Sequence, residues 1–181
     1  MGAGAAEGFN VNVPWPADGL GDSDYSLAFA HVVCPITAAF SPDVIIVSAG
    51  FDAADGDAQG KMRLTPAGYA ALTSMLRNAV SCPVVAALEG GYNVPVTAAC
   101  CEAVLRTLLG ERIPLPPLQR PNPCCESTLQ AVLAVQRKFW PILDTRAAKA
   151  ALARELKEAT EKGQAERVSK RSRVSSQRNN D

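Results

Sequence analysis

Two apolar runs, each ending in glycine and polar residues, constrain the fold of this chain more than any other feature. The first, Val44–Val47, leads into SAGFDAADGD, and the second lies within CPVVAALEGGY (82–92). Near-continuous apolar runs of this length are typical of strands buried on both faces. The stretch between them (64–80) predicts a helix, because Thr65 can cap it and Pro66 suits its first position. Two buried strands joined through a helix predict a parallel sheet.

Other segments extend this alternation of strands and helices. GFNVNVPW (8–15) alternates apolar and polar residues, which predicts a strand, and a helix is expected from about Tyr25 to Phe40. A third helix is expected over 96–110, where Gly110 ends it. A proline-rich stretch then leads to a shorter helix over Leu129–Trp140. The expected order is strand and helix repeated three times, an α/β fold with a parallel sheet and crossover helices.

The C-terminal part differs in composition from the rest of the chain. Residues 146–168 are rich in Ala, Glu, Lys and Arg, which favours a solvated helix. Opposite charges lie four positions apart in the pairs Arg154–Glu158, Lys157–Glu161 and Glu158–Lys162, which supports such a helix. The following run, ERVSKRSRVSSQR, is basic. It fits a disordered solvated tail, a nuclear localisation signal or a weak basic arm for nucleic acid. We therefore divide the chain into a domain part (1–143), a charged Ala-rich helix (144–168) and a basic disordered tail (169–181).

Composition excludes several classes of function. The chain has 18 Lys and Arg against 18 Asp and Glu, so its net charge gives no whole-chain case for nucleic-acid or membrane binding. The sequence contains no run of about eighteen apolar residues, so no membrane-spanning helix is predicted. The six cysteines include no CxxC pair, which favours buried free thiols over disulfides or a Cys-zinc site. We expect a location in the nucleus and/or the cytoplasm.

Candidate chemistry lies where the two buried strands end, since ligands of open parallel sheets bind beyond the carboxyl ends of the strands. Asp52 follows the first strand, and Glu89-Gly90-Gly91-Tyr92 follows the second. A carboxylate suits zinc or another divalent cation, and a tyrosine hydroxyl can donate to an oxyanion. On pattern alone a turn aspartate and a tight glycine turn are the more common interpretation, and the ligand site stays open as the alternative. A phosphate site is disfavoured, because Glu89 would repel phosphate and no P-loop pattern is present.

Five segments together resemble the zinc-dependent histone deacetylase family, in its class II branch. They are GFNVNVPW, GDSDYSLAF, SPDVIIVSAGFDAADGD, LTPAGYAALTSML and VVAALEGGYN, in the family's order and spacing. The similarity runs from about Gly8 to Trp140 and includes the closing segment LQAVLAVQRKFW. The resemblance implies a three-layer arginase/deacetylase-like α/β fold, of which this chain holds the C-terminal part.

The resemblance also implies roles for the residues at the strand ends. The Asp of GFD, here Asp52, is a zinc ligand in the family. The Tyr of GGY, here Tyr92, polarises the acetyl carbonyl and stabilises the tetrahedral oxyanion, and a Tyr at this position resembles the catalytically competent subgroup. Substrate contacts are implied for Phe51, Gly90 and Gly91, with the two glycines forming a wall of the acetyl-lysine tunnel.

Other residues of the family's site are not among these segments. A second Asp and a His come from an Asp-x-His segment upstream, and the general base comes from an upstream His-His pair. The single histidine, His31, is expected inside a helix as a packing or surface residue, and Asp55 and Asp57 are expected to be loop and solvation residues. Catalytic zinc normally takes three protein ligands plus water, and loss of a general base alone removes about 10²–10⁴-fold in rate. The deacetylation rate of the chain alone is therefore expected to be near background.

Several functional hypotheses stay open. The chain is interpreted as part of a lysine deacetylase acting on acetylated histones or other proteins, as a truncated or alternative product, or as half of a split enzyme with a complementary N-terminal half. The alternative is a non-catalytic interaction module of a chromatin complex, with corepressors as partners. A third interpretation is an acetylpolyamine or other small-amide hydrolase. Zinc stoichiometry separates the first two, because an interaction module should bind none tightly.

Overall fold

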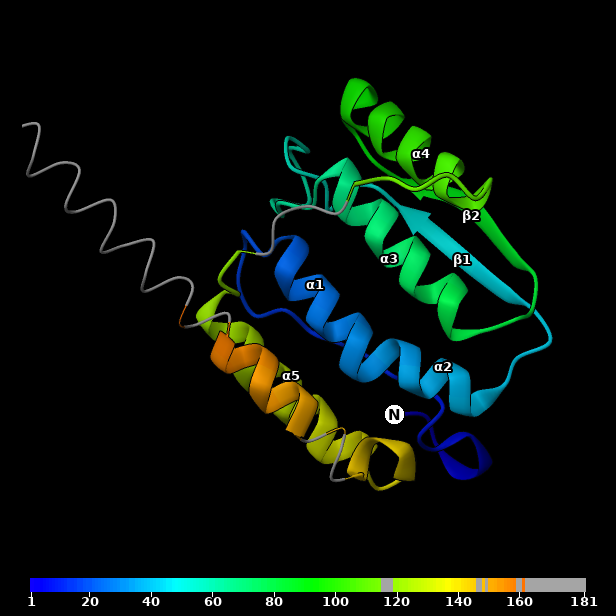
Figure 1. Cartoon of the computed structure of the whole chain (residues 1–181), viewed down its shortest axis with the longest axis vertical. Helices are drawn as coiled ribbons and strands as arrows, with labels where there is room; N and C mark the ends of the chain where they lie inside the picture. Colours follow the sequence, from blue (N-terminus) through cyan, green and yellow to red (C-terminus); the bar gives the residue numbers. More distant parts are fainter. Residues whose placement is uncertain (115–118, 146–147, 149, 159–160, 162–181) are drawn as a thin grey trace, which may run out of the picture.

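A two-stranded parallel sheet lies at the centre of the part of the chain that carries the candidate site. The structure is a computed structural model that describes residues 1–114, 119–145, 148, 150–158 and 161. Strand β1 (Ile45–Gly50) pairs in parallel with β2 (Val84–Gly90). Helix α3 (Pro66–Ala79) connects the two strands, and α4 (Val94–Leu108) follows β2 (Figure 1). The parallel sheet with its crossover helix confirms the expected α/β arrangement.

The start of α3 shows how the sequence specifies this unit. Thr65 is its N-cap residue and its hydroxyl accepts a hydrogen bond from the amide of Gly68 at 3.0 Å, with Pro66 at the first helical position. This capping geometry is the one that the sequence predicts. The Thr65 hydroxyl also donates to the Asp22 carboxylate at 2.8 Å, so the cap is tied to the first helix of the chain.

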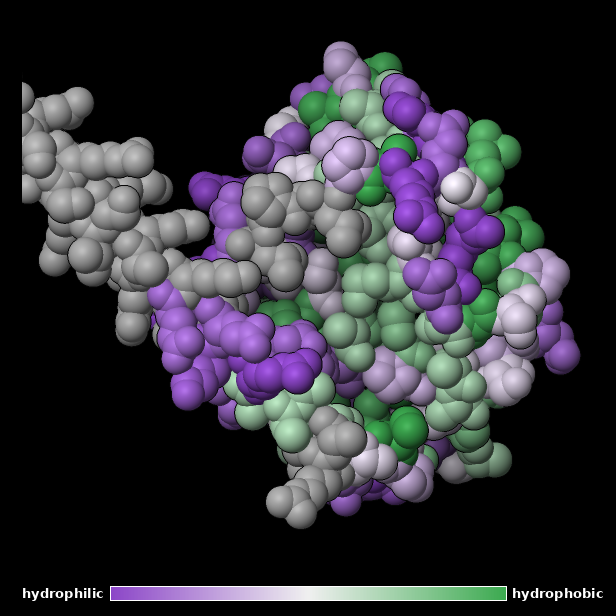
Figure 2. All heavy atoms as spheres, viewed as in Figure 1, coloured by the Kyte–Doolittle hydropathy of each residue, from purple (hydrophilic) through white to green (hydrophobic). Residues whose placement is uncertain are grey.

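Within the part of the chain that the structure describes, helices cover one face of the sheet and leave the other uncovered. An apolar cavity of about 230 Å³ is lined together by Val47 of β1, Val84 of β2, Leu72 of α3 and Val104 of α4, so these helices lie on the same side. On the other side Ile46, which is 72% exposed, stands beside its register partner Val85, which is 53% exposed. In Figure 2 hydrophobic side chains gather along the right-hand margin, where the sheet reaches the surface in Figure 1. One sheet face is therefore open. We call β1, α3, β2, α4 and the loops that join them the sheet layer.

A second group of helices forms the larger core. Helix α1 (Asp22–Ala28), a π-helical turn η2 (Phe29–Val33) and α2 (Cys34–Phe40) follow one another without a break, and α5 (Pro123–Gln136) and the 3₁₀ turn η3 (Pro141–Asp144) pack against them. With the helical residues 150–158 they form what we call the helical layer. Its buried side chains are Leu27, Ala28, Val32, Ile36, Cys125, Leu129, Val132, Leu133, Leu143 and Leu152.

The prediction of a strand over residues 8–15 is wrong. The segment contains no strand, although Val11, Val13 and Trp15 are half-buried in alternation with exposed neighbours and pack on the helical layer. The alternation in the sequence is therefore real, but it reflects packing on helices and not pairing in a sheet. Pro14 and Pro16 cannot donate to a ladder, which explains why apolar alternation alone does not produce a strand here.

The other helices lie near their predicted positions, but their lengths differ from the predicted lengths. Helix α4 ends near the predicted Gly110, whose φ of +92° suits glycine, and α5 begins at Pro123, well before the predicted Leu129. The side chain of Asn122 caps α5 by accepting from the amide of Cys124 at 3.1 Å. The end of a proline-rich segment can thus form the first turn of the helix that follows it. Among the described residues no helix is both long and apolar enough to cross a membrane.

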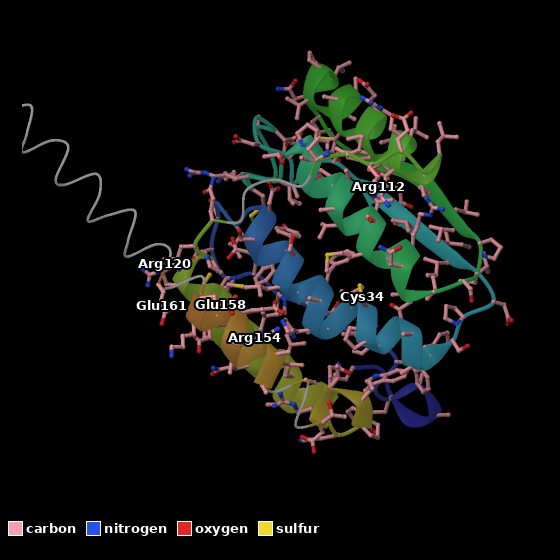
Figure 3. All side chains as sticks on the ribbon, in the orientation of Figure 1. Cys34, Arg112, Arg120, Arg154, Glu158 and Glu161 are labelled. Carbon is pink, nitrogen blue, oxygen red and sulfur yellow. The ribbon has the colours of Figure 1, made fainter. Side chains whose placement is uncertain are left out.

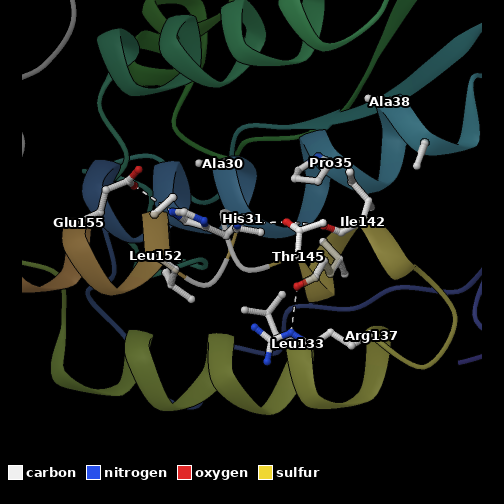
Figure 4. Close-up of a pocket in the computed structure, with 14 residues that line it drawn as sticks. Ala30, His31, Pro35, Ala38, Leu133, Arg137, Ile142, Thr145, Leu152 and Glu155 are labelled. Atoms are coloured by element: carbon white, nitrogen blue, oxygen red, sulfur yellow. Dashed lines mark hydrogen bonds and ion pairs between the residues drawn. The ribbon is translucent and has the colours of Figure 1, made fainter.

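The described part of the charged C-terminal segment is helical and contributes Leu152 to the core of the helical layer. The predicted ion pairs Arg154–Glu158 and Lys157–Glu161 are present, each at 3.8 Å, at the outer surface (Figure 3). On the inner side Glu155 lies 2.9 Å from the buried His31, beside a cavity of about 750 Å³ (Figure 4). His31 is thus a packing residue, as expected. The basic tail and the predicted pair with Lys162 lie outside the described residues.

Candidate functional site at the strand ends

The two predicted loops meet at one edge of the sheet. The backbone amide of Phe51, just after β1, donates to the carbonyl of Gly90 at the end of β2, at 2.9 Å. The Asp52 carboxylate lies over the glycines of both strands: a Cβ at Gly50 would be 2.9 Å from its Oδ1, and one at Gly90 would be 3.3 Å away. Small residues at the ends of both strands therefore leave room for this carboxylate beside the sheet.

Gly91 turns the chain from β2 towards Tyr92. Its φ of +121° lies in a region that residues with a Cβ rarely adopt. A Cβ here would come within 2.5 Å of the Thr97 hydroxyl oxygen and 3.1 Å of the Phe51 Cβ. Backbone conformation and the lack of space both require glycine at this position, which fixes the direction in which the chain leaves β2.

Tyr92 is the exposed end of this loop. Its side chain is 60% exposed, and its hydroxyl makes no hydrogen bond to any residue that the structure describes. Its backbone amide, by contrast, donates to the Asp57 carboxylate at 2.7 Å. The phenol is therefore available to a ligand while the backbone that carries it is held.

Asp57 is buried, which corrects the expectation that it is a loop and solvation residue. Its side chain is 7% exposed, and its carboxylate accepts hydrogen bonds from the amides of Gln59, Gly60 and Tyr92. These bonds, with that from Tyr92 foremost, hold the pKa of Asp57 below its usual value, so the carboxylate is ionised at neutral pH. Asp55, two residues earlier, is exposed as expected.

Phe51 lies below the edge of the sheet and not on it. Its ring is 3% exposed and packs against the ring of Tyr69 with centroids 5.0 Å apart. Tyr69 in turn donates to the carbonyl of Gly50 at 3.4 Å, and burial raises its pKa. The Phe51 ring therefore supports the backbone that carries Asp52, and a direct contact between this ring and a substrate stays a prediction.

Among the described residues, no three His, Cys, Asp or Glu side chains are close enough to hold a metal ion. Asp52 can supply one oxygen ligand, which is a third of what a catalytic zinc site takes from a protein. His31 is engaged by Glu155 in the helical layer. Burial raises the pKa of Cys100 to about 11 and that of Cys125 to about 12, so both are neutral thiols at neutral pH. The described residues thus do not form a zinc site by themselves.

The fold defines a parallel α/β protein in which the loops after β1 and β2 meet at one edge of the sheet. The family model described as "Histone deacetylase domain" matches residues 1–108. This match covers more than half of the chain, which therefore belongs to the histone deacetylase family. Its parallel sheet and helices are part of the arginase/deacetylase fold of that family.

Individual relatives agree with this assignment. Histone deacetylase 15 of Arabidopsis thaliana is 47% identical over 145 residues, which are 79% of this chain and 26% of that protein. The human polyamine deacetylase HDAC10 is 40% identical over 146 residues, 79% of this chain and 22% of that protein. The crystal structure of the HDA15 HD domain superposes with a TM-score of 0.75 at 44% identity, over 84% of this chain and 40% of that one. The chain spans about a quarter of these relatives and less than half of the solved domain.

Sequence reasoning found the residues at the strand ends but missed Asp57. The structure brings Asp52, Gly90, Gly91 and Tyr92 together, as a shared edge of parallel strands requires. The bond between Asp57 and Tyr92 joins positions 35 apart in the sequence. The cluster of three aspartates after β1 was the only signal available, and it does not show which of them turns inward.

Proposed function

We propose that the chain supplies part of the catalytic domain of a zinc-dependent deacetylase that hydrolyses acetyl-lysine in histones or other proteins. The observation that carries the proposal is the placement of Asp52 and Tyr92 after adjacent, hydrogen-bonded ends of two parallel strands. Ligands of open parallel sheets bind at this edge. The family match includes both residues.

Each residue has a distinct role in this proposal. Asp52 is one zinc ligand, and Tyr92 donates a hydrogen bond from its exposed phenol to the oxyanion that develops on the acetyl carbonyl. Gly90 and Gly91 form a tunnel wall, because the absence of side chains lets an acetyl-lysine pass close to the backbone. Phe51 supports this edge from below. Bound zinc would supply polarisation of the carbonyl and a more acidic water.

The site needs a complementary part, and the open face of the sheet is where we propose that it docks. Among the described residues β1 and β2 pair only with each other, and Ile46 and Val85 lie exposed side by side. Open strand edges beside an apolar face favour the addition of further strands. The chain covers 40% of the HDA15 HD domain, so the part of that domain that the chain does not match is the occupant that we propose.

Assembly and zinc content test the proposal. The part of the HDA15 HD domain that the chain does not match is produced as a separate polypeptide and mixed with the full chain. We expect a one-to-one complex that holds one zinc, whereas Asp52→Asn forms the complex but loses most of the metal. Exposed Asp55 gives the matched control Asp55→Asn, which should keep the zinc. A complex whose zinc content is unchanged by Asp52→Asn would overturn the assignment of Asp52.

A second candidate is a non-catalytic interaction module of a chromatin complex, with corepressors as partners. The incomplete ligand set among the described residues favours it. Zinc stoichiometry decides between the two, because an interaction module would bind partners through the open sheet face without tight zinc. Parallel assays with an acetyl-lysine peptide and an acetylpolyamine address the substrate, since HDAC10 is a polyamine deacetylase.

We further propose that the protein acts in the nucleus and/or the cytoplasm. The relatives named histone deacetylases and the basic C-terminal run support this location. Fusion of residues 165–181 to a fluorescent reporter tests the nuclear part of the proposal. Nuclear accumulation would support an import signal, and an evenly spread reporter would contradict it.

A further inference from the structure

One buried carboxylate at the strand ends has no part in the proposed chemistry. Asp57 accepts bonds with both oxygens, and the two oxygens have different partners. Oδ1 accepts from Gln59 at 2.8 Å and from Gly60 at 3.1 Å, within its own loop. Oδ2 accepts from Tyr92 at 2.7 Å, across to the loop after β2. We call these contacts the Asp57 bridge.

We propose that Asp57 is a positioning residue that fixes Tyr92 relative to Asp52, a role whose catalytic meaning rests on the proposed function. Asp57 and Asp52 belong to the loop after β1, and Tyr92 belongs to the loop after β2. The bridge holds the amide nitrogen of Tyr92, one bond from the Cα that carries the phenol. Displacement of a reacting group by about 1 Å can cost on the order of 10²-fold in rate, so holding this atom matters for catalysis.

The neighbouring contacts show that the whole β2 loop is attached to the β1 loop. Gly90 accepts from the amide of Phe51 at 2.9 Å, and the Asn93 side chain donates to the carbonyl of Gly56 at 2.8 Å. Tyr92 lies between these two attachments. The Asp57 bond is the one that involves a charged, buried acceptor, and such bonds are stronger than neutral ones. It is therefore the attachment whose loss should free Tyr92 most.

The geometry also separates positioning from simple loop folding. In Asp57→Asn the side-chain oxygen can still accept from Gln59 and Gly60, which preserves the local turn. The side-chain NH₂ group then faces the Tyr92 amide, and two donors cannot bond to each other. The variant therefore breaks the cross-loop contact while it leaves the turn in place. Asp55→Asn is the matched control, because it removes an exposed carboxylate two positions away.

The first test needs no variant. Nuclear magnetic resonance of the full chain, labelled with ¹⁵N and ¹³C, can detect a coupling across the hydrogen bond between the Tyr92 amide nitrogen and the Asp57 carboxylate carbon. The proposal expects this coupling at neutral pH. Its absence in a spectrum that shows such couplings along β1 and β2 would overturn the bridge.

The second test measures the tyrosine itself. The chain has three tyrosines, so 3-fluorotyrosine labelling gives three ¹⁹F resonances, and Tyr92→Phe assigns one of them. In Asp57→Asn we expect the Tyr92 resonance to shift and its amide to exchange about tenfold or more faster, with Gln59 and Gly60 still protected. Tyr25, Tyr69 and the Asp55→Asn protein should be unchanged.

An unchanged Tyr92 in Asp57→Asn would overturn the proposal, as would loss of protection at Gln59 and Gly60 together with Tyr92. These readouts do not depend on zinc or turnover. If the assembled protein shows no deacetylase activity, the positioning of Tyr92 can still be established. If activity is present and Tyr92 is insensitive to Asp57, only the positioning role fails.

Discussion

The helical layer and the sheet layer of this chain differ in how completely each is covered. The helical layer encloses a core in which Leu129, Cys125 and Val32 are fully buried. The sheet layer has a smaller apolar cluster, formed by the buried residues Phe51, Ala54 and Cys100, and among the described residues nothing covers the opposite sheet face. The residues with proposed chemistry all lie on the sheet layer.

This difference separates the part that holds the chain together from the part that carries the proposed chemistry. Buried apolar surface is the main source of folding free energy, so the helical layer should supply most of the stability. The sheet layer presents exposed apolar side chains of the kind that mark interaction surfaces. The edge that carries the candidate site is thus attached to a larger core, and in our proposal its completion depends on what covers the sheet.

The largest expected effect comes from truncation of the larger core. Leu129→Ala removes a fully buried side chain and should lower the free energy of unfolding by about 2–5 kcal/mol. Ile46→Ala removes an exposed side chain on the open sheet face and should change it by less than about 0.5 kcal/mol. Urea unfolding followed by circular dichroism measures both. Equal losses would mean that the open face is already covered in solution.

A smaller loss of stability is expected when either of two glycines with positive φ is replaced by alanine. Gly91→Ala meets both an unfavourable backbone conformation and contacts with Thr97 and Phe51, and it should cost about 2–4 kcal/mol. Gly110→Ala has φ of +92° but no atom within 4 Å of the added Cβ, so only the backbone cost of about 1–2 kcal/mol applies. Thermal and urea unfolding of both variants compares them. A larger cost at Gly110 would contradict the close packing around Gly91.

The smallest expected effect is a difference in alkylation rate between one buried cysteine of each layer. Cys100 of the sheet layer and Cys125 of the helical layer are both fully buried, and both are neutral at pH 8. Because a smaller core opens locally with less free energy, Cys100 should be alkylated about tenfold faster under native conditions. Peptide mass spectrometry after timed labelling measures the two rates. Faster labelling of Cys125 would reverse the assignment of the stable layer.

The sequence was sufficient to predict those features that depend on local chemistry. The cap at Thr65, the apolar run of β1 and the glycines after β2 each carry a direct signal, and parallel pairing then places Asp52 and Tyr92 at one edge. GFNVNVPW was predicted wrongly because alternation reports which side chains are buried and not what they are buried against.

Features that depend on distant partners could not be predicted. The inward orientation of Asp57 depends on the amide of Tyr92, and the burial of His31 depends on a helix more than a hundred positions later. Neither partner is marked in the local sequence, since Asp57 resembles its exposed neighbour Asp55. The open face of the sheet could likewise not be predicted. The sequence of an apolar strand is the same whether the residues that cover it come from its own chain or from another.

The central claim is that this chain carries part of a deacetylase site, which becomes active only when the sheet is completed. Its most direct test is the rate of deacetylation of an acetyl-lysine peptide by the full chain with zinc, with and without the complementary part of the HDA15 HD domain. We predict a rate near background for the chain alone and turnover by the assembly, reduced on the order of 10²–10³-fold by Tyr92→Phe. Turnover by the chain alone, or an assembly whose rate is unchanged by Tyr92→Phe, would contradict the account.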